Sequence, residues 1–244
     1  MTSQTQKFFH IGNILLLVCA ISCLVFYDLH GGLWLKGVTS SWFALLGLLN
    51  LCYARRIKLK STRYLLLMEA GLVIGMCADV LLGVQFLLGL LFFALGHVLY
   101  LTAFFTLEKP QPKDLLFIVP IAALSLFLVV GTPYIRVEDP MLEKLLLVYA
   151  IIIACMLGKA ASNFTLQKAP SRCLLFLGSA MFWFSDLMLA IDLFGTGSRL
   201  IWILCSYTYW PGQSILAYSM YHYVSEQYTR ACKTANCIDI HAPV

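Results

Sequence analysis

About eight segments of roughly 20 apolar residues recur along the 244-residue chain, and this repetition limits its possible folds more than any other feature. Hydrophobic residues make up 61% of the sequence and charged residues 12%, whereas about a quarter of a typical soluble domain is charged. Lipid is therefore the expected solvent. We predict an all-α fold, a polytopic membrane bundle of about eight transmembrane helices. The expected spans are residues 8–28, 33–54, 64–83, 86–106, 115–133, 141–160, 173–194 and 199–222.

Short connections between these segments leave no room for a separate soluble domain. We expect a single transmembrane domain over residues 1–228, with halves at 8–106 and 115–222, followed by a C-terminal tail at 229–244. The first apolar run is long and lacks a small-residue cleavage site. It is therefore expected to be retained as a helix rather than removed as a signal peptide.

Basic residues are distributed unevenly between the two sides of such a bundle. Only Lys36, Arg136, Lys144 and Arg199 of the 17 lysines and arginines fall on the side opposite the termini. The positive-inside rule then places both termini in the cytoplasm, in a bacterial inner membrane or an endoplasmic reticulum membrane. This topology explains the net charge of +5, with contact to anionic lipid as a secondary role. No nucleic-acid partner is expected.

Two aspartates interrupt the apolar segments at matching positions. Each follows a glycine by the same spacing, in Gly71-LVIGMCA-Asp79 and in Gly178-SAMFWFS-Asp186. A carboxylate inside the hydrocarbon region is costly, so a functional role is its default interpretation. The alternative is a structural role, in which each aspartate holds neighbouring helices together by hydrogen bonds.

The matching positions also suggest an internal duplication. A shift of 107 residues superimposes Asp79 on Asp186 and Tyr100 on Tyr207. Each half would contain an even number of spans, so the symmetry axis would run along the membrane normal. The two acidic helices would then face each other across this axis and form one site from the two halves.

Small residues on the first acidic helix indicate where Asp79 points. Gly71, Gly75, Asp79 and Gly83 are spaced by four residues, so they share one helix face on which another helix can pack closely. Asp79 is therefore expected to face protein rather than lipid. Other polar side chains occur at similar depth or beside the acids. These candidates are His97, Tyr100, Ser185, Tyr207, Tyr209 and Gln213.

Simpler interpretations exist for several of these candidates. His97 taken alone is more typical of an interior histidine bonded to a backbone carbonyl, and the tyrosines could belong to an interfacial belt. The remaining histidines are scattered, which argues against a zinc site. The sequence also lacks the G-x-S-x-G and H-E-x-x-H motifs. Acid–base chemistry by carboxylates is the simplest enzymatic hypothesis that remains.

Two blocks resemble the signatures of the YhhN-like lysoplasmalogenase family. The first is GLVIGMCADVLLG followed by FLLGLLFFALGHVLYLTAFF, and the second is GSAMFWFSDLMLAIDLF followed by YTYWPGQSILAYS. Weaker similarity surrounds Lys36 and the segment from Tyr149 to Lys159. The sequence departs from the family pattern at Ala78, where glycine is usual, and at Trp210-Pro211-Gly212.

This resemblance implies an intramembrane hydrolase that acts on lysoplasmalogens, which are lysophospholipids with a vinyl ether at sn-1. Its products would be a fatty aldehyde and glycerophosphocholine or glycerophosphoethanolamine, with water as co-substrate and no metal or organic cofactor. Asp79 and Asp186 would form the catalytic pair, one protonated and one ionised, as paired acids commonly divide their roles. Lys36 and Tyr149 would support them. The alternatives are a proton-coupled transporter and a receptor-like lipid-binding protein.

Overall fold

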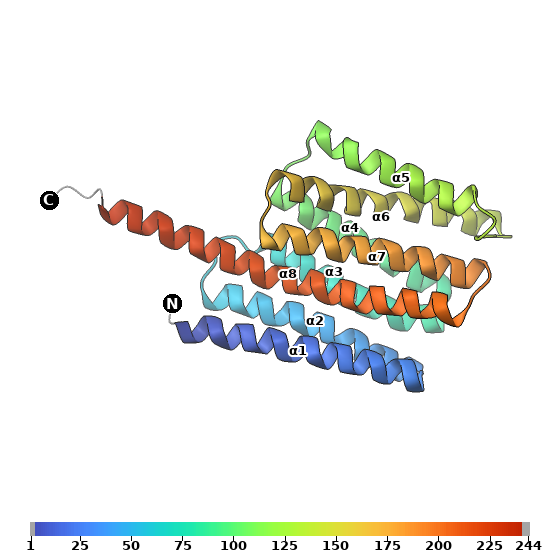
Figure 1. Ribbon diagram of the computed structural model, residues 1–244, viewed down its shortest axis with the longest axis horizontal. Helices are drawn as coiled ribbons and strands as arrows, with labels where there is room; N and C mark the ends of the chain where they lie inside the picture. Colours follow the sequence, from blue (N-terminus) through green and yellow to red (C-terminus); the bar gives the residue numbers. More distant parts are fainter. Residues whose placement is uncertain (1–2, 241–244) are drawn as a thin grey trace.

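The chain is all-helical in the computed structural model, which describes residues 3–240 (Figure 1). Lipid offers no hydrogen-bond partners to the backbone, and a helix satisfies its backbone groups internally. The predicted all-α bundle is confirmed, and the helix bounds are close to the expected spans except that α8 continues well beyond residue 222. The elements are α1 (Ser3–His30), α2 (Leu33–Arg56), α3 (Arg63–Val84), α4 (Phe86–Leu107), the 3₁₀ turn η1 (Pro112–Asp114), α5 (Leu115–Val130), α6 (Pro140–Leu166), α7 (Pro170–Phe194) and α8 (Arg199–Ile240).

Local sequence signals set several of the helix ends. Pro140 and Pro170 occupy the first positions of α6 and α7, where their missing N–H groups cost nothing. The Asp139 carboxylate caps α6 by accepting a hydrogen bond from the backbone N–H of Met141 at 2.8 Å. Between α1 and α2 the chain turns through Gly31 and Gly32 at φ values of 66° and 95°, which favour glycine.

Seven of the helices, α1 to α7, are long and apolar enough to cross a membrane, and the protein is an integral membrane protein. Helix α8 is less apolar because it carries polar residues such as Gln213 and Ser219, which are buried against neighbouring helices. Pro211 lies within α8 without ending it. Residues 229–240 of the expected tail continue α8, because neither glycine nor proline occurs between residues 223 and 240. Residues 241–244 lie outside the described part.

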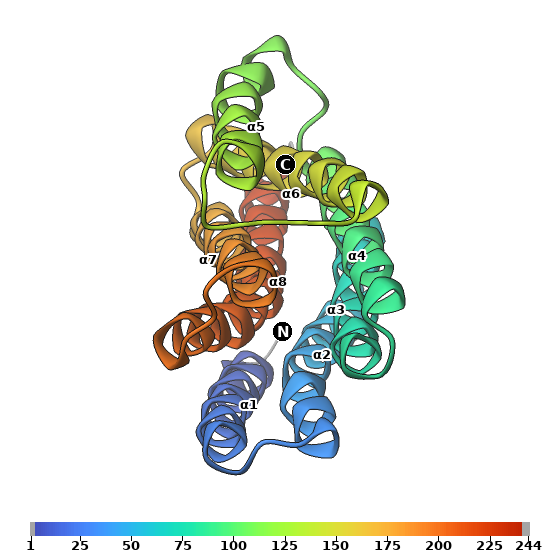
Figure 2. The same ribbon diagram turned by 90° about the vertical axis from the view of Figure 1, so that its right-hand side faces the viewer.

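Helix pairing repeats between the two halves of the chain. Helix α1 packs on α2, α2 on α3 and α3 on α4, and the same order recurs from α5 to α8. Between the halves, α2 contacts α8 and α6 contacts α4. These two contacts correspond to each other, because α2 occupies the same place in the first half as α6 in the second, and α4 the same place as α8. Figure 2 shows the helices end-on around the interior of the bundle. This arrangement supports the suggested duplication.

Helix α5 departs from the repeat. Helix α1 contacts α8, whereas within residues 3–240 the corresponding helices α5 and α4 have no contact. Helix α5 packs on α6 at the edge of the bundle (Figure 2). A Cβ atom on Gly158 of α6 would lie 2.7 Å from the Cα atom of Ile118, so the two backbones approach closely there. Trp183 of α7 holds α5 by donating a hydrogen bond from Nε1 to the Ser125 hydroxyl at 2.8 Å.

Candidate active site

The carboxylate of Asp79 is surrounded by hydrogen-bond donors. Its Oδ2 accepts hydrogen bonds from the Ser40 hydroxyl at 2.5 Å and from the Tyr209 hydroxyl at 2.8 Å. Its Oδ1 lies 3.7 Å from the ammonium of Lys36. Only 3% of the Asp79 side chain is exposed, so these contacts replace its solvation. Both carboxylate oxygens of Asp79 therefore face donors.

Asp186 has a different environment. Its Oδ2 accepts a hydrogen bond from the Tyr149 hydroxyl and lies 3.2 Å from Nε2 of His97. Nε2 also lies 2.9 Å from the Tyr149 oxygen. Because the Tyr149 hydroxyl donates its hydrogen bond to Asp186, it presents only acceptor capacity to His97. A hydrogen on Nε2 of His97 then faces both oxygens. Both of these donors thus converge on one oxygen of Asp186. The Asp186 side chain is 12% exposed.

The helices that serve the two acids obey the same pseudo-symmetry. Asp79 on α3 is contacted from α2 and from α8, whereas Asp186 on α7 is contacted from α6 and from α4. Exchange of the two halves converts one set of helices into the other. The side chains nevertheless differ, because Lys36, Ser40 and Tyr209 surround Asp79. Only Tyr149 and His97 contact Asp186. The two corresponding positions therefore have different chemical surroundings.

One polar cavity of about 110 Å³ joins the two acids. Asp79 and Asp186 both line it, together with Lys36 and Tyr209. In the described structure no hydrogen bond joins the two carboxyl groups, and α3 does not contact α7. The two candidate acids therefore share one cavity rather than a direct contact. Aromatic rings pack beside the acids, with the Phe182 and Tyr209 ring centroids 5.2 Å apart.

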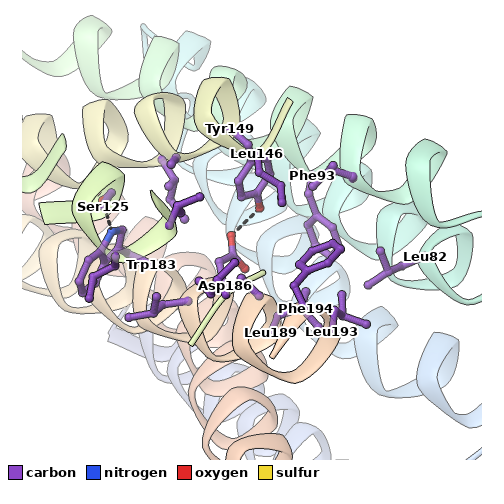
Figure 3. Close-up of a pocket in the computed structure, with 18 of the residues that line it drawn as sticks. Leu82, Phe93, Ser125, Leu146, Tyr149, Trp183, Asp186, Leu189, Leu193 and Phe194 are labelled. Atoms are coloured by element: carbon purple, nitrogen blue, oxygen red, sulfur yellow. Dashed lines mark hydrogen bonds between the residues drawn. The ribbon is translucent and has the colours of Figure 1, made fainter. Parts of the chain in front are cut away.

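A second, apolar cavity lies on the other side of Asp186. It is formed by side chains of α3 to α7, including Leu146, Leu189 and Leu193, and its volume is about 70 Å³ (Figure 3). Asp186 lines both cavities, and in Figure 3 its carboxyl group points toward Tyr149 at the apolar wall. The Ser125–Trp183 hydrogen bond marks the edge formed by α5 and α7. Asp186 thus lies where a polar compartment meets an apolar one.

Two glycines on the face of α3 that carries Asp79 leave room for the side chains of Tyr100 and Gln213. Tyr100 donates a hydrogen bond to Oε1 of Gln213 at 2.7 Å, and both side chains are fully or almost fully buried. A Cβ atom on Gly71 would lie 2.8 Å from Cδ1 of Tyr100, and one on Gly75 would lie 2.9 Å from Nε2 of Gln213. The glycines therefore allow a close approach of polar side chains that support the site.

The remaining candidates have lesser roles. Ser185 lines the polar cavity, but its hydroxyl donates to the backbone oxygen of Phe182 at 2.7 Å. Tyr207 does not join the acids: it is 37% exposed and bonds Asp28 at 3.3 Å, because its position on α8 turns it away from Tyr209. Ser40 was missed by the sequence-based prediction. Its position four residues after Lys36, on the same face of α2, is a signal that would have found it.

Among the described side chains, those of residues 4–233, no group of three or more His, Cys, Asp or Glu is arranged to hold a metal ion. The side chains that surround the acids are hydroxyl, imidazole, ammonium and aromatic groups. This set is suited to proton transfer and to stabilisation of charge at a buried carboxylate pair.

The fold defines a polytopic helical membrane protein, and the paired acids form its candidate site. The chain belongs to the YhhN family, whose profile matches residues 34–220 and therefore includes both aspartates. The suspected family is thus confirmed. Neither a curated protein nor a solved structure matches the chain.

Proposed function

We propose that the protein is a lysoplasmalogenase, which hydrolyses the sn-1 vinyl-ether bond of a lysoplasmalogen inside the membrane. The main support is the position of Asp186 between the polar cavity, which also contains Asp79, and the apolar cavity. A lysoplasmalogen has the same division, because its vinyl ether joins one hydrocarbon chain to a polar glycerophosphate. With the chain in the apolar cavity and the glycerol in the polar one, the scissile bond lies beside Asp186. Membership of the YhhN family supports this substrate class.

The two carboxyl environments favour different roles. Both oxygens of Asp79 face donors, including the Lys36 ammonium, so Asp79 acts as the ionised carboxylate. The donors around Asp186 converge on Oδ2, which leaves Oδ1 for a transferable proton. Asp186 protonates the vinyl carbon nearer the hydrocarbon chain. The carbon–carbon double bond becomes a single bond, and an oxocarbenium ion forms that the negative charge of Asp79 stabilises.

Water completes the reaction. A water molecule attacks the oxocarbenium carbon and gives one proton to the Asp186 carboxylate, which yields a hemiacetal and restores the acid. The hemiacetal hydroxyl then loses its proton, the bond to the glycerol oxygen breaks, and that oxygen takes up a proton. The sum is one substrate plus one water converted to one aldehyde and one glycerophosphodiester, with no net proton change.

The depth of the site suggests the leaflet from which substrate arrives. Asp79 lies five residues before the end of α3, and Asp186 lies eight residues before the end of α7. Both acids are therefore in the half of the bundle remote from the basic segment Arg55–Arg63. With that segment and both termini in the cytoplasm, the substrate would enter from the non-cytoplasmic leaflet.

The function is tested with purified protein and a synthetic 1-alkenyl lysophosphocholine. We expect stoichiometric release of fatty aldehyde and glycerophosphocholine, whereas the saturated 1-alkyl analogue should give no products because it cannot be protonated at carbon. A proton-coupled transporter or a lipid-binding receptor would bind either lipid without turnover. Absence of aldehyde from protein that binds these lipids would therefore exclude the proposal.

The apolar cavity is proposed to bind the hydrocarbon chain of the substrate, and a larger side chain in this cavity tests that assignment. Ala190 lines the apolar cavity, so Ala190→Phe should raise KM for a long-chain lysoplasmalogen by about tenfold or more, by overpacking. A short-chain substrate should be affected by less than about twofold. Ala123→Phe, on the exposed face of α5, is the matched control and should behave as wild type. Equal losses for both chain lengths in Ala190→Phe would mean that the chain lies elsewhere.

A further inference from the structure

The polar cavity has an aromatic wall that the proposed reaction does not use. Tyr27 of α1 and Trp202 and Trp210 of α8 line this cavity together with the acids. The ring centroid of Tyr27 lies 6.0 Å from that of Trp202 and 5.1 Å from that of Trp210. Three aromatic side chains therefore cluster beside a compartment whose other walls carry carboxylates.

Contacts around the cluster fix its geometry. The indole Nε1 of Trp210 donates a hydrogen bond to the Ser40 hydroxyl at 3.0 Å. Since that hydroxyl in turn donates to Asp79, the position of the Trp210 ring is linked to that of the acid. The guanidinium of Arg199 lies 4.7 Å from the Trp202 ring centroid and forms an ion pair with Asp28. Trp202 thus already has a cation against its ring, which is the contact that an aromatic face favours.

The charges that line the cavity also favour a cationic ligand. Its carboxylates are Asp79, Asp186 and Asp192, while Lys36 is the one basic side chain among the described residues that line it. Asp192 has no ion pair within the described part of the chain. Even with one catalytic acid protonated, the cavity carries more negative than positive charge.

We propose that Tyr27, Trp202 and Trp210, with Asp192, form a binding site for a quaternary ammonium headgroup. A trimethylammonium group is bulky, weakly hydrated and unable to donate hydrogen bonds, so aromatic walls and a nearby carboxylate suit it. A primary ammonium is more strongly hydrated and requires several acceptors, which aromatic rings do not supply. This inference rests on the proposed function for the lipid class, and it adds selectivity for choline over ethanolamine.

Binding of non-hydrolysable ligands tests the site without requiring turnover. The full-length protein in nanodiscs is titrated with the saturated 1-alkyl lysolipids that carry phosphocholine, phosphoethanolamine or phosphate. Wild-type protein should bind the phosphocholine lipid about tenfold more tightly than the others. Trp202→Leu should remove this preference, and Tyr27→Leu should weaken it. Trp34→Leu changes a tryptophan that is 84% exposed outside the cavity and should keep the wild-type preference.

The outcomes separate this inference from the proposed function. Equal affinities for the three headgroups in wild type, or an unchanged preference in both Trp202→Leu and Tyr27→Leu, would overturn the headgroup site. So would an equal loss of preference in Trp34→Leu. A choline preference that depends on Trp202, found in protein that releases no aldehyde from the vinyl-ether lipid, would support the site and reject the enzymatic proposal. Size-exclusion profiles of the variants identify any that fail to fold.

Discussion

Replacement of Asp186 by asparagine is expected to lower the rate of aldehyde release by about a thousandfold or more, within the range for loss of a general acid. Asparagine has nearly the same shape and can still accept the hydrogen bond from Tyr149, so the fold should be preserved. It has no acidic proton to transfer to the vinyl carbon. The measurement is kcat for a 1-alkenyl lysophosphocholine, together with the melting temperature in detergent.

Asp139→Asn is the matched control for this substitution. Asp139 caps α6 outside both cavities, and asparagine is an equally good cap. This variant should keep wild-type activity and stability. Near-normal turnover by Asp186→Asn would show that Asp186 is not the proton donor.

Replacement of Asp79 by asparagine should have a comparable effect on activity and an additional effect on stability. The variant loses the negative charge that stabilises the oxocarbenium ion, and we expect kcat to fall by about a hundredfold to a thousandfold. It also leaves the Lys36 ammonium without its counter-ion, although only 17% of that side chain is exposed. Loss of one partner from a buried ion pair typically costs about 3 kcal/mol or more, so the melting temperature should fall.

A double variant separates catalysis from structure at Asp79. In Lys36→Met with Asp79→Asn both charges are removed, and replacement of a whole buried pair by neutral groups is often tolerated. The double variant should therefore regain most of the lost thermal stability and remain inactive. Recovery of activity together with stability would instead support the alternative in which Asp79 only holds helices together.

The sequence predicted the membrane bundle because each span is a local property. A run of about 20 apolar residues must avoid water, and its backbone can be satisfied in lipid only as a helix. The observed bounds, such as Leu33–Arg56 for α2, follow this rule closely. The two acids could also be identified from the sequence, since a carboxylate in such an apolar run is unfavourable unless protein surrounds it. Helix α8 was predicted as well, although it is less apolar than the other long helices.

The side chains that contact each acid were harder to predict from the sequence, because they come from distant parts of the chain. Ser40 bonds Asp79 from 39 residues away, and His97 approaches Asp186 from 89 residues away. Neither the aromatic wall that includes Trp202 nor the apolar cavity has a local sequence signal. Tyr207 illustrates the reverse case: it matches Tyr100 in the duplication but lies outside the site.

The sequence by itself therefore determined that this chain is a multi-helix membrane bundle and that two acids lie within its apolar segments, and it suggested that the halves are related. Only the tertiary structure decided which side chains meet each acid and that Asp186 separates a polar from an apolar cavity. The physical reason is that lipid solvates all apolar helix faces equally, so hydropathy cannot specify which faces pair. Pairing depends on close packing at residues such as Gly71 and Gly75 and on hydrogen bonds between helices, which become visible only when the helices are assembled.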